Sequence, residues 1–321
     1  MFKIGIDIGG TKCAVILGEI NGSAVKFIET SFFPTIKDNT YKTTLVKIED
    51  EMLKMIEKSN LKTSDISSIG ISCGGPLNSK TGVIMSPPNL IGWDDVHIVE
   101  YFESKYKIKT VLENDANACA LAEWKFGAGK DKNVKNVIFL TFGTGFGAGL
   151  ILDGKLYSGT NGMAGEIGHI RAEKSGPVGY GKAGSFEGFC SGGGIAQIAR
   201  VKLLELFQMG QKPSFCENIN NIDKVTARDI AEAAKNGDEL AIEIYNISGE
   251  YLGYSLSLLI DLLNPEMIII GSIYERCEDL LKSKCFEIIK KESLRHSFSV
   301  CEVVPAVLGD DIGLYAALAL E

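Results

Sequence analysis

The order of apolar and polar residues predicts two copies of one plan, each beginning with β-strands joined by short turns. The first copy opens with three β-rich segments whose short turns favour an antiparallel meander. These segments are residues 2–7, 13–18 and 24–33. The residues after them predict a helix at 43–60, a buried strand at 66–75, a helix at 101–106, a strand at 108–115 and a helix at 116–127.

The second copy starts at residue 136 with a strand, a glycine–threonine turn and another strand, as the first copy does. A third short strand follows Asp153–Gly154. The remaining pattern predicts helices near 226–236, 239–263 and 278–292, strands at 265–272 and 298–306, and a C-terminal helix at 312–320. We therefore predict an α/β fold in which a duplicated β-meander with helices forms two lobes and a ligand cleft between them.

The composition is that of a globular protein. At 321 residues, with 45% hydrophobic and 23% charged residues, the chain can form two domains with a core each. The N-terminus lacks a basic region followed by an apolar stretch, so we expect no secretory signal. The most apolar helical candidate has ten uncharged residues, 251–260, well short of the roughly 20 that span a bilayer. We expect a cytoplasmic protein without a membrane partner.

Charge and cysteine spacing narrow the classes of partner. A net charge of −8 and the absence of any basic tract argue against binding nucleic acid, which needs many lysines and arginines against phosphates. None of the eight cysteines forms a CxxC pair, and most lie in apolar runs, as buried free thiols do. The pattern indicates neither a disulfide framework nor a structural zinc site. A small anionic ligand in a local pocket is compatible with this charge.

Two glycine turns carry the first chemical signal. In the first, Asp7 ends a strand and Gly9, Gly10 and Thr11 follow. Glycines let backbone N–H groups approach an oxyanion, and an aspartate at this point can hold Mg²⁺ through water. An ordinary tight hairpin is the alternative. The second turn, within residues 142–149, again has a threonine between glycines, which favours two phosphate loops that bind one nucleotide from both sides.

Two other glycine-rich stretches do not meet the requirements of known phosphate loops. Residues 176–183 match a P-loop except that Ala183 stands where the Mg²⁺-binding serine or threonine belongs. Polar residues precede this stretch, where a P-loop requires a buried strand. The second glycine turn fails the GxGxxG spacing of a dinucleotide loop and opens no predicted helix.

Several polar residues stand where ligands are often bound. Asp115, beside Asn114, begins a predicted helix, where it either caps the helix or acts as a general base. Glu166 and His169 lie among glycines, which favours a nearby small ligand, although a lone histidine is more often structural. Glu187 is equally ambiguous. Gly271 ends a strand before a helix, where ligands bind in α/β sheets and where ordinary turns also occur.

Together these motifs resemble the ROK family (repressor, open reading frame, kinase). DIGGTK, CGGPLN, PPNLIGW, ENDANACALAEW, residues 143–170 and LGDDIGLYAALAL follow the order and spacing of that family nearly from end to end. The resemblance implies a duplicated actin-like, ribonuclease H-like ATPase fold and a sugar kinase. Its lobes would comprise residues 1–117 with the C-terminal helix of about 309–321, and residues 118–308.

The resemblance implies a role for each matching position. The ATP-binding positions would include Asp7, near Mg²⁺, and the loop residues Gly9, Gly10, Thr11, Lys12, Gly143, Thr144 and Gly145, with Gly271 on the adenosine side. Asp115 would be the catalytic base, and Asn114 would bind a sugar hydroxyl beside it. The other sugar-binding positions would be Gly75 and Asn89, with Glu166, His169 and Glu187 near the anomeric end.

The sequence departs from the family pattern in the zinc-binding segment. Family members typically bind zinc through a histidine and three cysteines, and here Val178, Tyr180 and Ser185 occupy the cysteine positions. We expect no zinc, and packing around Glu187 must then replace the metal. Repressor members carry a helix-turn-helix before this core. The first phosphate loop begins at Asp7, so we expect no such segment. Dimers are common in the family, so the resemblance makes a homodimer one possible state.

The leading hypothesis is an ATP- and Mg²⁺-dependent kinase that phosphorylates the 6-hydroxyl of glucose, with Asp115 as general base. N-acetylmannosamine, fructose or another hexose is the alternative acceptor. A protein that senses sugar without turnover is the alternative of another class.

Overall fold

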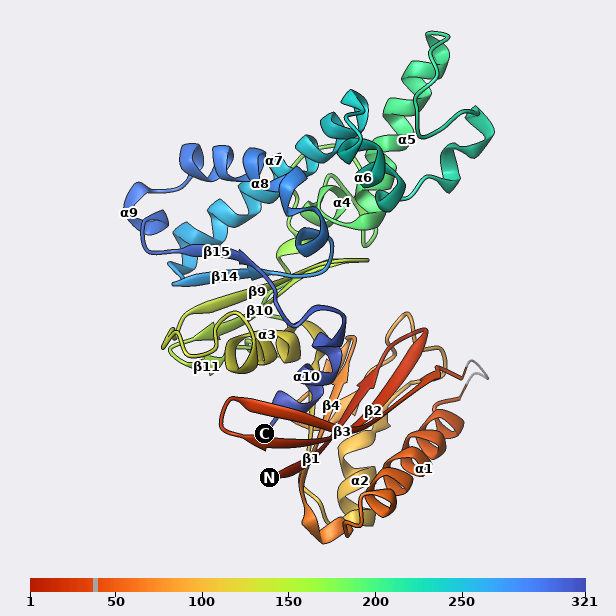
Figure 1. Ribbon diagram of the computed structural model, residues 1–321, viewed down its shortest axis with the longest axis vertical. Coiled ribbons are helices and arrows are strands. Elements are labelled where there is room, and N and C mark those ends of the chain that lie inside the picture. Colours follow the sequence, from red (N-terminus) through yellow and green to blue (C-terminus); the bar gives the residue numbers. More distant parts are fainter. Residues whose placement is uncertain (37–39) are drawn as a thin grey trace. The chain divides into compact units, whose positions relative to one another are not determined.

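The computed structural model describes residues 1–36 and 40–321 (Figure 1). Within these residues the chain forms two compact units. The first comprises residues 1–135, 149–164 and 308–321, and the second comprises residues 136–148 and 165–307. The lobe boundary predicted between residues 117 and 118 falls inside a helix of the first unit, and that division stays a prediction.

The first unit carries one large sheet, a small one and the helices around them. Its elements are β1 (Phe2–Ile8), β2 (Lys12–Asn21), β3 (Ala24–Pro34), α1 (Lys42–Lys58), η1 (Thr63–Asp65), β4 (Ile66–Cys73), β5 (Leu77–Asn78), β6 (Val83–Ile84), β7 (Val96–His97), α2 (Ile98–Tyr106), β8 (Thr110–Asn114), α3 (Asp115–Phe126), β11 (Lys155–Leu156), η4 (Gly309–Asp311) and α10 (Ile312–Ala319). The large sheet has the order β3-β2-β1-β4-β8.

The strand directions in the large sheet confirm the predicted antiparallel meander and set the place of the site. β1, β2 and β3 are antiparallel neighbours, whereas β4 lies parallel to β1 and β8 lies parallel to β4. In this register Asp7 is opposite Ser72, and Cys73 is opposite Asn114. The carboxyl ends of three parallel strands therefore meet at one edge, which is where α/β sheets bind ligands.

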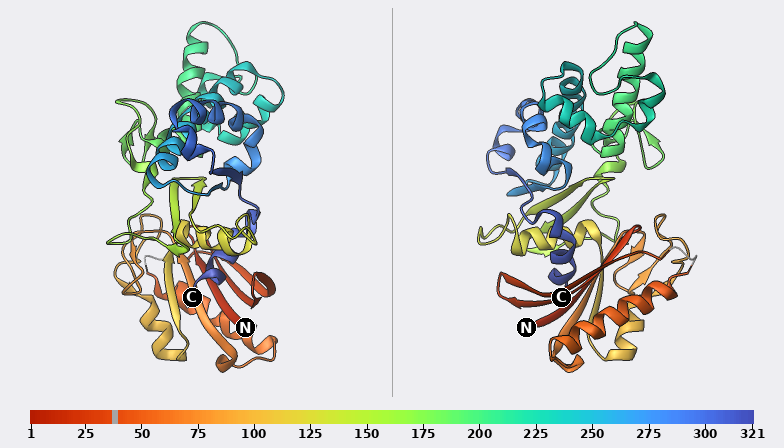
Figure 2. Two further views of the ribbon diagram at one scale, coloured as in Figure 1. Left: turned by 90° about the vertical axis from the view of Figure 1, so that its left-hand side faces the viewer. Right: turned by 45° about the vertical axis from the view of Figure 1, so that its right-hand side comes forward.

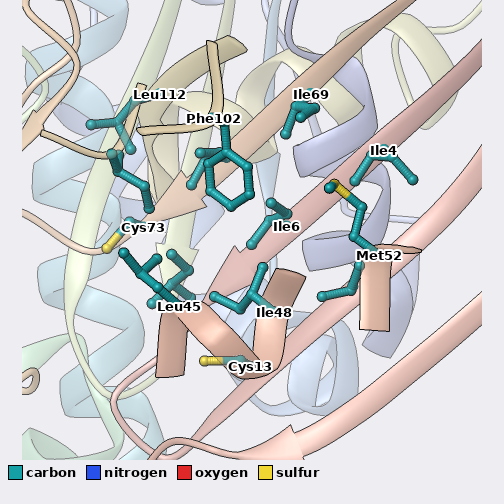
Figure 3. Close-up of a cluster of buried hydrophobic side chains, with 14 of the residues drawn as sticks. Ile4, Ile6, Cys13, Leu45, Ile48, Met52, Ile69, Cys73, Phe102 and Leu112 are labelled. Atoms are coloured by element: carbon teal, nitrogen blue, oxygen red, sulfur yellow. The ribbon is translucent and has the colours of Figure 1, made fainter. Parts of the chain in front are cut away.

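The central strands of the large sheet are buried on both faces because they carry runs of apolar residues, whose side chains point to one face and the other in turn. Ile4, Ile6, Cys13 and their neighbours pack against α1 and α2 in one cluster, part of which is drawn in Figure 3. Ala14 and Ile16, which point the other way, pack against α10. Both views of Figure 2 show α1 and α2 along the same face of this sheet. The site edge is thus held between two packed layers.

The second unit is mainly helical around part of a second sheet. Its elements are β9 (Val137–Phe142), the start of β10 (Phe146–Leu152), η2 (Ile167–His169), β12 (Val178–Gly179), β13 (Lys182–Ala183), α4 (Phe186–Phe189), α5 (Gly192–Gln208), η3 (Ile219–Lys224), α6 (Ala227–Lys235), α7 (Glu239–Leu263), β14 (Met267–Ile270), α8 (Ile273–Glu292), α9 (Arg295–Phe298) and β15 (Glu302–Pro305). The second sheet has the order β11-β10-β9-β14-β15, with β14 parallel to both β9 and β15.

The long helices α7 and α8 pack closely because α7 presents glycines to its neighbour (Figure 1). A Cβ added at Gly253 would lie 2.6 Å from the Cβ of Ile288 and 2.7 Å from the carbonyl oxygen of Cys285.

Among the described residues, no helix is both long enough and apolar enough to cross a membrane.

Several elements differ from the sequence prediction, which also missed the short β12–β13 hairpin and α4. Helix α5 was not predicted, because Gly192, Gly193 and Gly194 at its start weaken the helical signal, although Ser191 caps it. The predicted strand at 298–306 is shorter, since residues 295–298 form α9 and only Glu302–Pro305 form β15. The strands of the small β5-β6-β7 sheet have two residues each, too few to show a period.

Candidate functional site

A cavity of about 380 Å³ opens at the site edge of the first unit. It is lined by ends of β1 and β4, the start of α3 and the start of α10. The predicted residues in its lining are Asp7, Gly9, Gly10, Lys12, Gly75, Asn89 and Asp115. Thr11 and Asn114 are not among the lining residues. A larger hollow of about 760 Å³ beside α8 is lined by lysines, Glu287, Ser283 and Phe286 and contains no predicted site residue.

The first glycine turn is a hairpin turn with added support from Thr35, the residue that follows β3. The Gly9 N–H donates to the Lys12 carbonyl oxygen at 3.0 Å. Thr35 braces both sides of the turn: its hydroxyl donates to the Gly9 oxygen at 2.5 Å, and its N–H donates to the Thr11 oxygen at 2.9 Å. A Cβ added at Gly10 would lie 2.6 Å from the Cβ of Asn89. The turn is therefore rigid, and Gly10 is required by its contact with Asn89.

Lys12 is held over this cavity by an aromatic ring. Its Nζ lies 5.2 Å from the centroid of the Phe32 ring, and both residues line the cavity. Phe32 is 56% exposed, so its ring is not part of the core. A cation–π contact of this kind restricts the ammonium group while leaving its charge available to an anion.

Asp7 and Asp115 line the same cavity, and the charge of Asp115 raises the pKa of Asp7. Burial, and after it the nearby charge of Asp115, raises the pKa of Asp7 to about 6, against the opposing effects of Lys12 and a hydrogen bond with Ser72. Two carboxylates in one small cavity repel each other unless a cation or a proton is shared. Mg²⁺ is typically held by one or two carboxylates together with phosphate oxygens and water. The residues present therefore fit Mg²⁺.

Asp115 is the first residue of α3 and not its N-cap, although one of its oxygens shares the capping hydrogen bond. The cap is Asn114, whose Oδ1 accepts a hydrogen bond from the Ala116 N–H at 3.0 Å. Oδ1 of Asp115 accepts from the same N–H at 2.8 Å. Its Oδ2 lies beside Gly74, where an added Cβ would be 3.9 Å away. Burial raises the pKa of Asp115, which suits a group that accepts a proton.

Two buried residues that were not predicted hold the start of α3 in place. Oε1 of Glu113 accepts hydrogen bonds from the Asn114 N–H at 2.9 Å and from the Asn117 amide at 3.0 Å. The amide of Asn114 points toward Gly75, where an added Cβ would lie 3.5 Å from Nδ2. Glu113 and Asn117 belong to the ENDANACALAEW motif. The motif therefore included these two residues, but the sequence alone did not reveal their hydrogen bonds.

The second glycine turn, in the second unit, joins β9 to β10. The Gly143 N–H donates to the Gly145 carbonyl oxygen at 3.1 Å. The carbonyl oxygen of Gly143 accepts from the N–H of Gly192, at the start of α5, at 2.9 Å. A Cβ added at Gly143 would lie 3.1 Å from the Ser272 hydroxyl. The structure thus brings the predicted residue Gly143 next to the segment that contains Gly271, while the side chain of Thr144 has no described hydrogen bond.

Glu187 also contacts this turn. Its Oε2 accepts a hydrogen bond from the Phe146 N–H at 3.1 Å. Gly168 lies between the two: an added Cβ would be 1.8 Å from the Phe146 carbonyl oxygen and 3.3 Å from the Glu187 Cβ. Gly168 belongs to the 3₁₀ turn η2, which Glu166 precedes and His169 ends. The second glycine turn, η2 and the start of α4 therefore converge within the second unit.

Hydrogen bonds hold the segment that lacks the family's cysteines. It forms the β12–β13 hairpin, and Gln197 on α5 bonds both the N–H and the carbonyl oxygen of Val178, at 2.8 and 2.9 Å. Ser185 caps α4, and Tyr180 packs edge-on against His169 with ring centroids 6.1 Å apart. In residues 1–36 and 40–321, no three His, Cys, Asp or Glu side chains are grouped to hold a metal, and all cysteines there are free thiols. That the protein binds no zinc stays a prediction.

Comparison with known proteins identifies the relatives of this chain. The family model described as "ROK family" matches residues 3–321. The chain is 32% identical over 313 residues to a glucokinase of Halalkalibacterium halodurans, with 97% of this chain and 92% of that protein covered. It is 29% identical over 320 residues to a xylose repressor of Caldicellulosiruptor bescii, of which it covers 77%.

A solved relative supports the fold. The crystal structure of a ROK family glucokinase from Streptomyces griseus, in complex with glucose and AMPPNP, superposes with a TM-score of 0.72 at 27% identity, and the match covers 100% of this chain and 99% of that one. The predicted α/β, actin-like ATPase fold class is confirmed. The roles of individual residues stay predictions, as does the assembly of the two groups of residues into one site.

Proposed function

Because the chain belongs to the ROK family, we propose that it is an ATP-dependent hexose kinase. The observation that carries the proposal is the pair Asp7 and Asp115, which face one cavity beside a rigid glycine turn. A carboxylate alone would also suit a protein that only binds sugar, because it accepts hydrogen bonds from hydroxyls, so the combination of Asp115 with two glycine turns of phosphate-loop type supports the kinase. Repressors are also among the relatives, and the presence of both glycine turns in addition to Asp115 is what favours an enzyme over a sensor.

In the proposed reaction Asp115 accepts the proton of the attacking sugar hydroxyl. Its raised pKa brings it closer to the range in which a carboxylate both exists as the anion and accepts a proton readily. The γ-phosphoryl group passes through a loose transition state, so positioning and charge stabilisation supply most of the rate enhancement. Asn114 and Glu113 orient Asp115 by fixing the first turn of α3.

The glycine turns and Lys12 would bind the phosphates of ATP. The turn around Gly10 exposes backbone close to the cavity, and Lys12 adds a positive charge held by Phe32. When bound, Mg²⁺ would neutralise charge on the phosphate oxygens, with Asp7 holding it through water. Gly143, Thr144 and Gly145 would form the second phosphate loop, and Gly271 would lie on the adenosine side.

The proposed acceptor is the 6-hydroxyl of glucose, supported by the glucokinases among the relatives. Gly75, Asn89 and Asn114 in the first unit, with Glu166, His169 and Glu187 in the second, would contact the sugar. Discrimination between hexoses depends on a few hydrogen bonds to individual hydroxyl or acetamido groups. N-acetylmannosamine and fructose are therefore the alternative acceptors to test.

The experiment is a coupled assay of ADP release with ATP and Mg²⁺ over a panel of hexoses and amino sugars. We expect sugar-dependent ADP release, largest with glucose. Turnover with another hexose alone would correct the substrate and keep the kinase. Tight sugar binding without ADP release from any member of the panel would contradict the kinase and establish a sensor.

A further inference from the structure

The carboxylate of Glu187 connects two regions to which the proposed function gives different roles. Its position matches a sugar-contacting residue of the family, yet in the structure its Oε2 accepts the hydrogen bond of the Phe146 N–H in the second glycine turn, at 3.1 Å. The turn comes close to this oxygen along its length, since a Cβ added at Gly145 would lie 3.0 Å from Oε2. Glu187, which is expected to contact the sugar, thus holds the backbone of the turn that is expected to bind phosphate.

The same carboxylate has an oxygen available for a second partner. Glu187 is half-buried, and among the described residues Oε1 accepts no hydrogen bond. An ionised carboxylate accepts at both oxygens, so a backbone N–H on Oε2 and a sugar hydroxyl on Oε1 are compatible. A hydroxyl on Oε1 fixes the orientation of the carboxylate and therefore the position of the N–H bonded to Oε2.

The Cβ of Glu187 is closely packed. A change in the orientation of its carboxylate therefore moves the bonded turn rather than the Glu187 backbone. Backbone at Gly168 and Gly179 lies against its Cβ, where added methyl carbons would be 3.3 and 2.7 Å away. The other end of the turn is held by the Gly192 N–H, which donates to the Gly143 oxygen at 2.9 Å and lies five residues after Glu187. One short segment, residues 187–192, therefore holds both ends of the second glycine turn.

We propose that Glu187 is a positioning residue of the second glycine turn and couples sugar binding to nucleotide binding. This rests on the proposed kinase function. Sugar bound at Glu187 favours the ordered turn, and the ordered turn binds the phosphates of ATP more tightly. Because linkage is reciprocal, the nucleotide must tighten sugar binding by the same factor.

The test is isothermal titration calorimetry of AMPPNP with Mg²⁺, without and with saturating glucose or the best sugar of the panel. In the wild-type protein we expect sugar to tighten AMPPNP binding by about 5- to 150-fold, the usual range of such coupling. In Glu187→Ala the factor should fall to about one. In the control His169→Ala, whose side chain has no described contact with the turn, sugar binding weakens while the factor stays within about twofold of wild type.

A second pair of variants tests the contact from the turn itself and does not depend on the folding of Glu187→Ala. Gly145→Ala places a Cβ 3.0 Å from Oε2 and should weaken sugar binding in the absence of nucleotide. Gly147→Ala, whose Cβ would meet only the Thr141 hydroxyl at 3.9 Å, should leave sugar binding unchanged. Equal effects of the two alanines, or a wild-type factor in Glu187→Ala, would overturn the proposal. A wild type that binds both ligands without coupling would overturn it too, whereas one that binds neither would refute the kinase function.

Discussion

The two glycine turns have the same sequence plan but different support. The first is closed by its own hairpin, by Thr35 directly after β3, and by Asn89. The second is held by Glu187 and Gly192, more than 40 residues further along the chain. A carboxylate, Asp7, precedes the first turn, whereas Phe142 precedes the second. A repeated motif can therefore be held by its neighbouring residues in one copy and by a distant segment of the chain in the other.

The largest effect should come from the two aspartates that line the cavity beside the first turn, Asp7 and Asp115. We expect Asp115→Asn to lower kcat by about 10²- to 10⁴-fold, the usual contribution of a general base, while the Kd for sugar changes little. Steady-state kinetics and calorimetry measure the two quantities. Cys119→Ser, a neighbouring change in the same cavity, is the control and should retain kcat. Full turnover in Asp115→Asn would remove Asp115 as the base.

Asp7, beside the first turn, should make the free energy of unfolding depend on pH. Its carboxyl has a pKa of about 6 in the folded protein against 3.8 ordinarily, so folding favours the protonated form. The free energy of unfolding therefore falls as pH rises from 3.8 to about 6 and is constant above that range. Without Mg²⁺, Asp7→Asn should remove this penalty and raise the free energy of unfolding by about 3 kcal/mol at pH 8 and about half as much at pH 5.

Urea denaturation at the two pH values measures this difference, and Asp310→Asn is the matched control at another acidic residue of the cavity. An equal gain in the free energy of unfolding at pH 5 and pH 8 would show that Asp7 does not titrate as described.

The activity of the wild type should also depend on pH. Its kcat/KM should fall as pH drops below about 6, because protonated Asp7 and Asp115 cannot act as anions.

Alanine substitutions in the two turns compare their rigidity directly. Gly10→Ala meets the Cβ and backbone oxygen of Asn89 at 2.6 and 2.8 Å, whereas Gly143→Ala meets the movable hydroxyl of Ser272 at 3.1 Å. Overpacking costs about 1–3 kcal/mol, so we expect kcat/KM for ATP to fall about tenfold or more in Gly10→Ala. Gly143→Ala should lose about threefold or less. Equal losses in kinetic assays would contradict the difference in support.

The smallest effect should come from Phe32, whose ring lies beside Lys12 near the first turn. A cation–π contact at an exposed site contributes about 0.5–1 kcal/mol, so Phe32→Ala should raise KM for ATP about two- to fivefold without changing KM for the sugar. Phe32→Tyr, which keeps an aromatic face, should restore the wild-type value. An unchanged KM for ATP in Phe32→Ala would show that the ring does not position Lys12.

The sequence was sufficient to predict features that depend on local periodicity. The meander of β1, β2 and β3, the strand and helix on either side of Asp115, and the repeat of the glycine turn all follow from residues close in the chain. The cavity residues Asp7 and Asp115 were predicted because strand ends and glycines mark them. Helix α5 was missed because three glycines at its start weaken the pattern.

Contacts between distant residues could not be predicted in this way. Nothing local indicates that Asn89 packs on Gly10, 79 residues earlier, or that Glu187 bonds the backbone of Phe146. The cation–π partner Phe32 lies on a strand whose alternation only marks it as exposed. These contacts depend on the register of strands and on the packing of segments, which a single sequence does not specify.

The central claim is that Asp115 directs a hexose 6-hydroxyl onto the γ-phosphoryl group of ATP. The most direct measurement compares glucose with 6-deoxyglucose, which lacks that hydroxyl, by ³¹P nuclear magnetic resonance of reactions with ATP and Mg²⁺. We predict a sugar 6-phosphate resonance with glucose, binding without a phosphorylated product for 6-deoxyglucose, and formation of the glucose product slowed about 10²- to 10⁴-fold in Asp115→Asn. A phosphorylated product from 6-deoxyglucose, or only inorganic phosphate from glucose, would contradict the account.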